Sequence, residues 1–362
     1  MGPGQCNSVL AASHKFSWRR NLLPVGLVAS LTFAASNLAK ADEGGVPFWL
    51  SGQFGSLAAA PQVPGWSVGI VTYIDSVSAS GNVAAAREVT IGRFNPAVNV
   101  NLNLNLTARP DLVLVAPGYV FSTPVFGGQL AVSVGEAVGW SPADLNGTLT
   151  VTLGPLTATR QGEIADSRWG LSDLYPQTSL RWNNGVNSWM VYGTGDIPVG
   201  TYDANRLANL GIGHGAIDGG VGYTYFDPMA GHEFSVVTGL TYNFINPSTD
   251  YQNGVDWHLD WGASQFVTKT VQVGAVGYFY QQLTADRGAA PFLGENLSRI
   301  AGIGPQIGFI FPAGPLQGYL NFKGYGEFAA QNRAAGWNAW VTLAFSPKAE
   351  PPTMMKRPMI TK

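Results

Sequence analysis

Residues 98–107 alternate strictly between aliphatic and polar side chains, and this alternation constrains the fold more than any other feature of the chain. The segment reads VNVNLNLNLT, so every valine or leucine is followed by an asparagine or a threonine. Successive side chains of a strand point to opposite faces, so the pattern predicts a strand with one apolar and one polar face. The apolar face requires a dry environment, which is either a protein core or a lipid bilayer.

The same period of two recurs along the chain, in the ranges 148–153, 188–196, 233–244, 255–264, 316–328 and 337–345. Strands of soluble domains usually have about 5 or 6 residues, whereas a tilted membrane-spanning strand needs about 9 to 11. All of these segments except 148–153 are long enough for such a strand. Aromatic residues lie near the ends of the apolar faces, as in an interfacial girdle. They are Trp140, Trp182, Trp189, Tyr242, Trp257, Trp261, Phe279 and Trp337.

The composition favours a membrane barrel over a soluble β-sandwich or propeller, which is the alternative architecture. Charged residues make up 12% of the chain, against about 25% in an average soluble domain. Glycine is abundant, with 46 residues. Half of each barrel strand is polar, so the mean hydropathy of a barrel stays modest. The net charge of −2 gives no indication of a nucleic-acid partner.

The N-terminus resembles a secretory signal peptide. Lys15, Arg19 and Arg20 precede a mostly apolar stretch at 22–33 that is too short to span a bilayer as a helix. Ala39-Lys40-Ala41 provides small residues at the two positions that signal peptidase reads. We therefore expect cleavage after Ala41, with an uncleaved anchor helix as the alternative. Cys6 is the only cysteine, so a mature chain that begins at residue 42 has no disulfide or cysteine metal site.

Counting strands back from 334–345 predicts fourteen, and a count of twelve is the alternative. Their predicted ranges are 66–76, 97–107, 111–122, 128–140, 148–160, 176–183, 186–197, 212–226, 232–245, 255–267, 270–283, 300–311, 315–328 and 334–345. Short turns at 183–185, 227–231, 268–270 and 312–315 alternate with longer loops at 161–176, 198–211, 246–254 and 285–299. Outer-membrane barrels show this asymmetry, with short periplasmic turns and longer outer loops.

Four segments follow from this count: a signal peptide at 1–41, an N-terminal segment at 42–65, an antiparallel transmembrane barrel at 66–345 and a disordered tail at 346–362. We expect 42–65 to be plug-like inside the barrel; a periplasmic leader or a further wall strand are the alternatives. Leu343 and Phe345 end the last strand with the alternation that barrel-assembly machinery recognises. In a lipid-facing wall, Asn99, Asn101, Asn103 and Asn105 would form an uncharged rail inside the barrel, which favours neutral solutes.

Six motifs are spread over almost the whole mature chain. In order, they are FWLSGQFG at 48–55, GDIP at 195–198, NPSTDYQNGVDWH at 246–258, GYFYQQ at 277–282, AGIGP at 301–305 and KGYGEFAAQNR at 323–333. Together they resemble the outer-membrane transporter family named for the meta pathway of phenol degradation. The resemblance implies a barrel distantly similar to the long-chain fatty-acid outer-membrane transporter, with a role in the uptake of hydrophobic or aromatic compounds. The tail after Phe345 departs from the family pattern.

Ten residues on the polar parity are candidates to line the lumen and contact a ligand: Asp256, His258, Asp260, Tyr278, Tyr280, Gln282, Tyr319, Lys323, Tyr325 and Glu327. Aromatic rings with a polar group can stack on a flat ligand, or can simply fill a narrow interior. The trio Asp256, His258 and Asp260 shares one strand face and could hold a metal. We favour a hydrated, ion-paired wall instead, so we expect no metal and no cofactor.

The sequence thus predicts an all-β, antiparallel barrel in the bacterial outer membrane for passive uptake of small hydrophobic or aromatic compounds. A general diffusion porin for small polar solutes is the alternative. A membrane phospholipase would need an outward-facing Ser–His pair, and no such pair is apparent, so we do not expect an enzyme. The expected partners are outer-membrane lipid, the barrel-assembly machinery and a small hydrophobic ligand, without nucleic acid.

Overall fold

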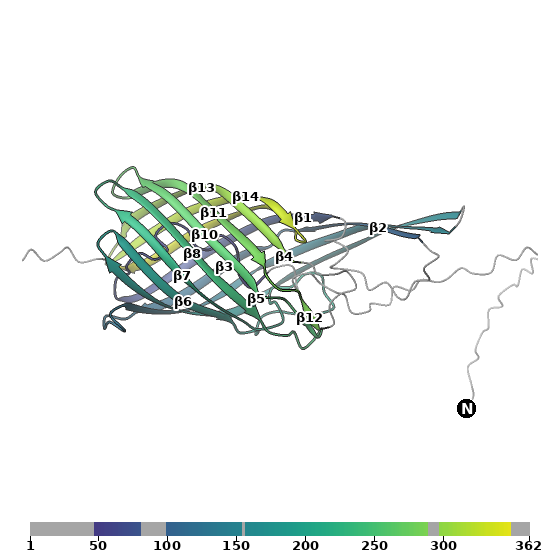
Figure 1. Ribbon diagram of the computed structural model, residues 1–362, viewed down its shortest axis with the longest axis horizontal. Helices are drawn as coiled ribbons and strands as arrows, with labels where there is room; N and C mark the ends of the chain where they lie inside the picture. The colour runs from purple at the N-terminus through teal and green to yellow at the C-terminus, as the bar shows by residue number, and fades with distance from the viewer. Residues whose placement is uncertain (1–46, 81–98, 154–155, 289–296, 349–362) are drawn as a thin grey trace, which may run out of the picture. The chain divides into compact units, whose positions relative to one another are not determined.

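The computed structural model describes residues 47–80, 99–153, 156–288 and 297–348, and these ranges contain strands and no helix (Figure 1). The strands are β1 (Gly65–Ser80), β2 (Asn99–Ala108), β3 (Asp111–Val120), β4 (Gln129–Leu153), β5 (Leu156–Asn184), β6 (Asn187–Asp196), β7 (Ala216–Asp227), β8 (His232–Asn243), β9 (Tyr251–Gln252), β10 (Asp256–Phe266), β11 (Val271–Gln282), β12 (Arg287–Gly288), β13 (Arg299–Ala313), β14 (Leu316–Gln331) and β15 (Ala335–Pro347). No helix in these ranges could cross a membrane. The predicted signal peptide and most of the predicted tail lie outside the described residues.

Twelve antiparallel strands close into a ring, so the predicted barrel is confirmed and the alternative count of twelve is the correct one. The ring runs β1–β3–β4–β5–β6–β7–β8–β10–β11–β13–β14–β15 and returns to β1. The closing pair joins the first and last strands in a long register, from Val68 opposite Phe345 to Ser78 opposite Ala335. β9 lies in the connection from β8 to β10, and β12 lies in the connection from β11 to β13. These two strands pair with each other in a separate two-stranded sheet.

The sequence predicts two strands too many because three ring strands are much longer than expected. They are β3, which β2 continues, β4 and β5. β2 and β3 keep a single register against β1, since Val77 faces Ala108 and Ile74 faces Asp111. They are one strand interrupted at Pro110, which has no N–H to donate to the ladder. The ladder continues across the break, where Arg109 N donates to Pro142 O at 3.2 Å.

β4 and β5 pair along almost their whole lengths, from Gln129 opposite Arg181 to Leu153 opposite Leu156. The predicted strand at 148–160 is therefore the end of β4 and the start of β5, and the predicted loop at 161–176 is wrong because it lies within β5. Glycine and aspartate suggested a loop there, but cross-strand pairing overrides such weak local preferences. β2 pairs with this extension and lies outside the ring (Figure 1), so the strand predicted to carry the asparagine rail is not part of the barrel wall.

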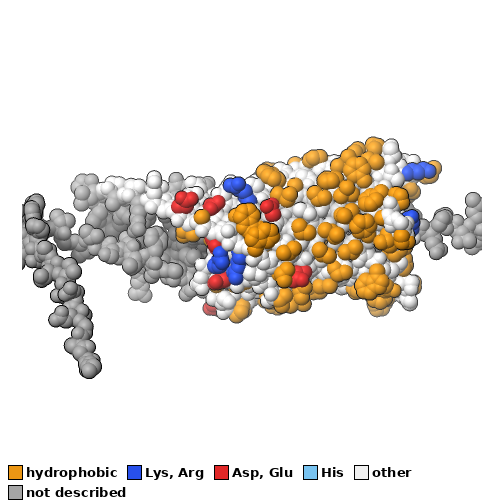
Figure 2. Space-filling view, turned by 180° about the vertical axis from the view of Figure 1, so that it is seen from behind, with side chains coloured by type: hydrophobic (Ala, Val, Ile, Leu, Met, Phe, Trp, Pro, Cys, Tyr) orange, Lys and Arg blue, Asp and Glu red, His pale blue; other side chains and the backbone are white. Residues whose placement is uncertain are grey.

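The burial pattern separates an inner and an outer face. In β10, Asp256, His258 and Asp260 are buried, whereas Trp257 and Leu259 between them are partly exposed. Figure 2 shows hydrophobic side chains spread over the barrel surface, with most of the visible charged side chains towards its ends. The predicted short turns at 183–185, 227–231, 268–270 and 312–315 fall where consecutive ring strands connect, as expected. This apolar band around a closed ring is typical of a barrel in a bilayer.

Candidate functional site: the barrel lumen

Residues 47–64, called the N-terminal segment below, lie within the ring and contact side chains from opposite walls. Arg181 of β5 approaches Ala58 O at 3.5 Å, and Gln306 of β13 donates to Ser56 Oγ at 2.6 Å. β5 and β13 are six positions apart in the ring of twelve strands, and are therefore opposite each other. Between these walls, the backbone N–H of Leu57 donates to Glu233 at 2.8 Å and that of Ala59 to Thr224 at 2.9 Å.

A carboxylate and an ammonium group hold three consecutive residues of this segment from two sides. Asp260 of β10 accepts the N–H groups of Gly52 at 3.0 Å and Phe54 at 3.1 Å. Lys323 of β14 donates to the carbonyl oxygens of Gly52, Gln53 and Phe54 at 2.6, 3.0 and 3.3 Å. Both side chains are almost completely buried. We call this arrangement the Asp260–Lys323 clamp; each charge is satisfied by backbone dipoles, as a buried charge requires.

The turn inside the clamp depends on glycine. Gly52 has a φ of +87°, in the left-handed region that L-residues with a Cβ rarely adopt. A Cβ there would also lie 2.9 Å from the Tyr325 ring. Tyr325 donates its hydroxyl to Gly52 O at 3.1 Å, so this carbonyl group has a second wall contact beside Lys323.

The segment carries apolar side chains into the lumen. Trp49 is 1% exposed and stacks on His258, with ring centroids 3.4 Å apart and an interplanar angle of 15°. It also lies 5.9 Å from the Phe54 ring and 6.0 Å from the Tyr192 ring. Met190 and Val237, which point inward from β6 and β8, complete a buried cluster with these rings.

A second buried cluster lines the lumen at β11, β14 and β15. The Tyr278 and Tyr325 rings lie 4.9 Å apart, and Trp340 and Tyr280 belong to the same cluster. Tyr278 donates to Glu327 at 2.6 Å and accepts from Asn338 Nδ2 at 2.9 Å. The Lys323 ammonium lies 5.1 Å from the centre of the Trp340 ring, a cation–π distance.

The ten predicted lumen residues all lie on the inward-facing side of their strands, where eight are buried and Tyr319 and Glu327 are partly buried. His258 Nε2 lies 2.8 Å from Asp218, and Asn243 donates to Asp256 at 2.9 Å. Gln282 donates to Asp286 at 2.6 Å, and Tyr319 accepts from Gln272 at 2.7 Å. The described residues contain no group of three or more His, Cys, Asp or Glu side chains suited to a metal ion.

Sequence reasoning missed several residues that hold this interior together. Asp218 lies on β7, far from His258 in the sequence, and Arg333 places its guanidinium 4.7 Å from the centre of the Tyr280 ring. The aromatic character of 48–54 was the available signal for Trp49. A short glycine-rich segment outside the predicted strands has little reason to carry Phe48, Trp49 and Phe54 unless they are buried.

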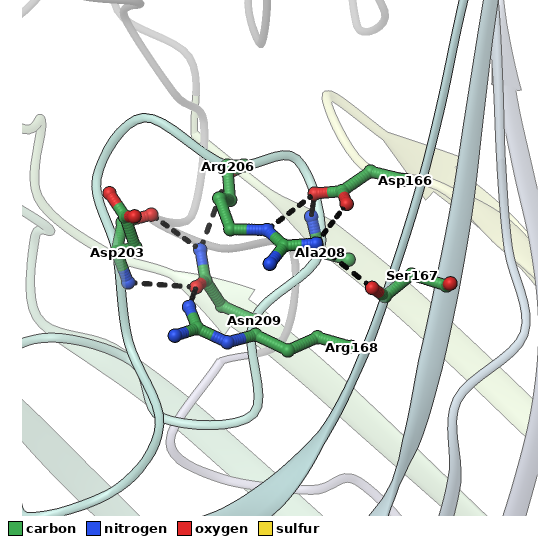
Figure 3. Close-up of polar contacts among 7 residues, drawn as sticks. All are labelled: Asp166, Ser167, Arg168, Asp203, Arg206, Ala208 and Asn209. Carbon is green, nitrogen blue, oxygen red and sulfur yellow. Dashed lines mark hydrogen bonds and ion pairs between the residues drawn. The ribbon is translucent and has the colours of Figure 1, made fainter.

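The connection between β6 and β7, residues 197–215, is bound to the long edge of β5 (Figure 3). Arg206 forms an ion pair with Asp166 and donates to Ser167 O at 2.9 Å. The hydrogen bond to Asp166 raises the pKa of Arg206. Asn209 accepts from Arg168 at 3.2 Å and from the N–H of Asp203 at 2.9 Å. The loop thereby covers part of a strand edge that the ring leaves unpaired.

Comparison with known proteins agrees with this fold. The family model described as "Putative MetA-pathway of phenol degradation" matches residues 111–343. An outer membrane channel from Pseudomonas putida F1 aligns with a TM-score of 0.53 at 12% identity, over 79% of this chain and 96% of the channel. A FadL homologue from Pseudomonas aeruginosa covers 85% of this chain and 97% of its own, with a TM-score of 0.38 at 9% identity.

The CymD monoaromatic hydrocarbon channel aligns over 88% of this chain and its whole length, with a TM-score of 0.33 at 7% identity. No curated protein matches the sequence. The closed ring, its apolar outer band and the alignment with the Pseudomonas putida channel place this protein in the bacterial outer membrane.

Proposed function

The chain belongs to the phenol-degradation MetA-pathway family, and from this membership and the lumen we propose that it lets small hydrophobic compounds, including aromatic ones, cross the outer membrane passively. The barrel is a channel-type fold, and the proposed passage involves no chemical step. Outer-membrane lipid surrounds the apolar band. We also propose that barrel-assembly machinery inserts the chain, because Leu343 and Phe345 end the last strand.

The observation that carries this proposal is the content of the lumen. Two apolar clusters, one at Trp49 and one at Tyr278, occupy the interior together with the N-terminal segment. A general diffusion porin needs a continuous aqueous path, because ions and sugars retain their hydration water. These two clusters of tyrosine, tryptophan and aliphatic side chains, set among the polar groups of the wall, favour a solute that gives up little hydration on entry.

Within this proposal, residues 42–65 act as a plug. Their described part, 47–64, is held by hydrogen bonds to Thr224, Glu233 and Asp260 on one side and Lys323 on another. The ten inward residues would form the ligand-contacting wall, with Tyr278, Tyr280 and Tyr325 supplying flat apolar surfaces that carry a hydroxyl group.

The test is uptake by vesicles that contain the purified protein. The outer leaflet of these vesicles should be lipopolysaccharide, which slows the spontaneous entry of hydrophobic solutes. We expect phenol and a short alkane to enter faster than into protein-free vesicles, while arabinose enters at the protein-free rate. Equal acceleration of all three solutes would establish the porin instead. No acceleration of any solute would contradict both readings.

A further inference from the structure

We propose that Trp49 determines the selectivity of this channel against polar solutes, and that the Asp260–Lys323 clamp is the device that positions it. The inference rests on the proposed function. It assigns the selectivity of the channel to the N-terminal segment rather than to the strands of the wall. It names one side chain as the polar barrier and two others as its supports.

The position of Trp49 suits it to this role. Its indole packs against wall residues from two strands, His258 on β10 and Tyr192 on β6, and against Phe54 of its own segment. Phe54 and Tyr192 are themselves only 5.8 Å apart. A solute that crosses the lumen on this side must therefore pass through contacts between aromatic rings, where a sugar or hydrated ion would lose water without replacement.

The same site has polar groups that could bind a neutral solute. Trp49 Nε1 and His258 Nδ1 are both buried and have no hydrogen-bond partner among the described residues. The two rings that carry them are stacked face to face. A buried N–H without a partner is costly, so a small molecule with an apolar body and one hydroxyl or carbonyl group would be favoured here. Phenolic compounds have this chemistry, whereas sugars carry too many polar groups to satisfy.

The clamp explains why Trp49 stays in place. Asp260 and Lys323 bind the backbone at 52–54, which starts three residues after Trp49 and ends at Phe54. Neutralising either residue leaves the other charge buried with weaker compensation, which is strongly destabilising for the bound arrangement. Loss of the clamp should therefore release the aromatic cluster without altering the ring of strands, because neither charge takes part in a strand ladder.

The experiment measures arabinose entry into vesicles that contain the full mature chain. Trp49→Ala should raise arabinose entry roughly tenfold or more, the change that a barrier lower by about 1.4 kcal/mol produces. Trp49→Phe should stay within about twofold of the wild type, since a flat apolar ring remains. Trp66→Ala is the matched control, because Trp66 is 71% exposed on the outer surface. Only variants whose migration on gels changes on heating, as for a folded barrel, are scored.

The positioning role needs a second readout. Ser51→Cys places the single cysteine of the mature chain at a buried position of the segment, where a membrane-impermeant maleimide should react slowly. Adding Lys323→Met or Asp260→Asn should speed labelling and raise arabinose entry together. Lys269→Met, in an exposed turn, should change neither.

A folded Trp49→Ala variant that still excludes arabinose overturns the inference, while phenol uptake by the wild type would leave the proposed function intact. Conversely, a wild type that does not accelerate phenol entry contradicts the proposed function, and arabinose entry through Trp49→Ala can still be scored. Leakage of Lys323→Met without faster labelling of the cysteine at position 51 would contradict the positioning role of the clamp.

Discussion

Glu136 is an ionisable residue on the apolar outer face of the barrel. It has the same parity as Val134 and Val138 of β4, which are 41% and 46% exposed, and lies opposite Val115, which is 44% exposed. A carboxylate on the lipid-facing side of a barrel is destabilising, although less so than a lysine or arginine. The β4–β5 register shifts next to it, between Glu136 and Val138.

Replacing Glu136 with leucine should stabilise the barrel by roughly 1 kcal/mol, since the desolvation of the carboxylate is removed. The measurement is the midpoint of urea unfolding in lipid vesicles, followed by the heat-dependent gel shift. Val134→Leu is the control for added apolar area at the same face. A Glu136→Leu midpoint at or below that of the wild type would show that the carboxylate has a stabilising partner.

Residue parity was largely predictable, whereas residue partners were not. The alternation in 316–328 correctly places Lys323 and Tyr325 on the inner face. It gives no indication that Lys323 binds carbonyl groups about 270 positions earlier in the chain, as it does at Gln53. Parity follows from the local geometry of a strand. Partners depend on which distant segments the closed ring brings together.

At the scale of elements, a buried carboxylate binds the loop at 197–215 at two points, in addition to the Arg206–Asp166 ion pair. Asp173 of β5 is 1% exposed and accepts the N–H groups of Gly200 and Ile212, each at 2.7 Å. Thr201 adds a backbone bond to Leu171 at 2.9 Å. Asp173 therefore joins both ends of the loop to the strand beside it.

Asp173→Ala should free this loop, because it leaves two N–H groups without acceptors at a cost of about 1–3 kcal/mol each if they stay buried. Local opening should then expose Arg206 to trypsin. We expect cleavage at Arg206 at least about tenfold faster than in the wild type, the ratio that 1.4 kcal/mol of local stability produces. Asp173→Asn, which keeps one acceptor oxygen, should be intermediate.

Asp227→Ala is the matched control for this experiment. Asp227 also accepts backbone N–H groups, from Met229 at 2.8 Å and Ala230 at 3.2 Å, but in the short turn between β7 and β8. Equal cleavage at Arg206 in Asp173→Ala and Asp227→Ala would show that Asp173 is not the anchor of the loop.

Element types followed from the sequence better than element lengths. Short turns such as 183–185, which reads Asn-Asn-Gly, are recognisable because residues with weak strand preference interrupt an alternating pattern. Pro110 has the same appearance, yet the strand continues through it in register. The difference lies in the neighbouring strands β1 and β4, which keep pairing on both sides of the proline and which no local window contains.

At the scale of the whole molecule, the N-terminal segment decides whether the ring encloses an open path. Deleting 47–60 should turn a weakly conducting protein into a stably open one, since the contacts to Thr224, Glu233, Asp260 and Lys323 are lost together. Single-channel conductance in planar bilayers measures this directly. We expect a rise of roughly tenfold or more, as for the removal of a barrier of about 1.4 kcal/mol.

Ring closure does not use this segment, because β1 begins at Gly65 and pairs with β3 and β15 independently of it. The deleted protein should therefore retain the gel shift of a folded barrel, which serves as the folding control. Conductance equal to that of the wild type would argue against a plug at 42–65.

The sequence by itself determined the class of fold, the faces of its strands and the medium outside it. These depend on the period of two and on composition, which are local properties that survive without knowledge of partners. Only the tertiary structure decided that twelve strands close the ring, that residues 99–107 lie in an extension rather than in the wall, and that Trp49 stacks on His258 inside. Ring closure and lumen packing join residues far apart in the chain, and a one-dimensional pattern does not specify which of many similar strands and rings will meet.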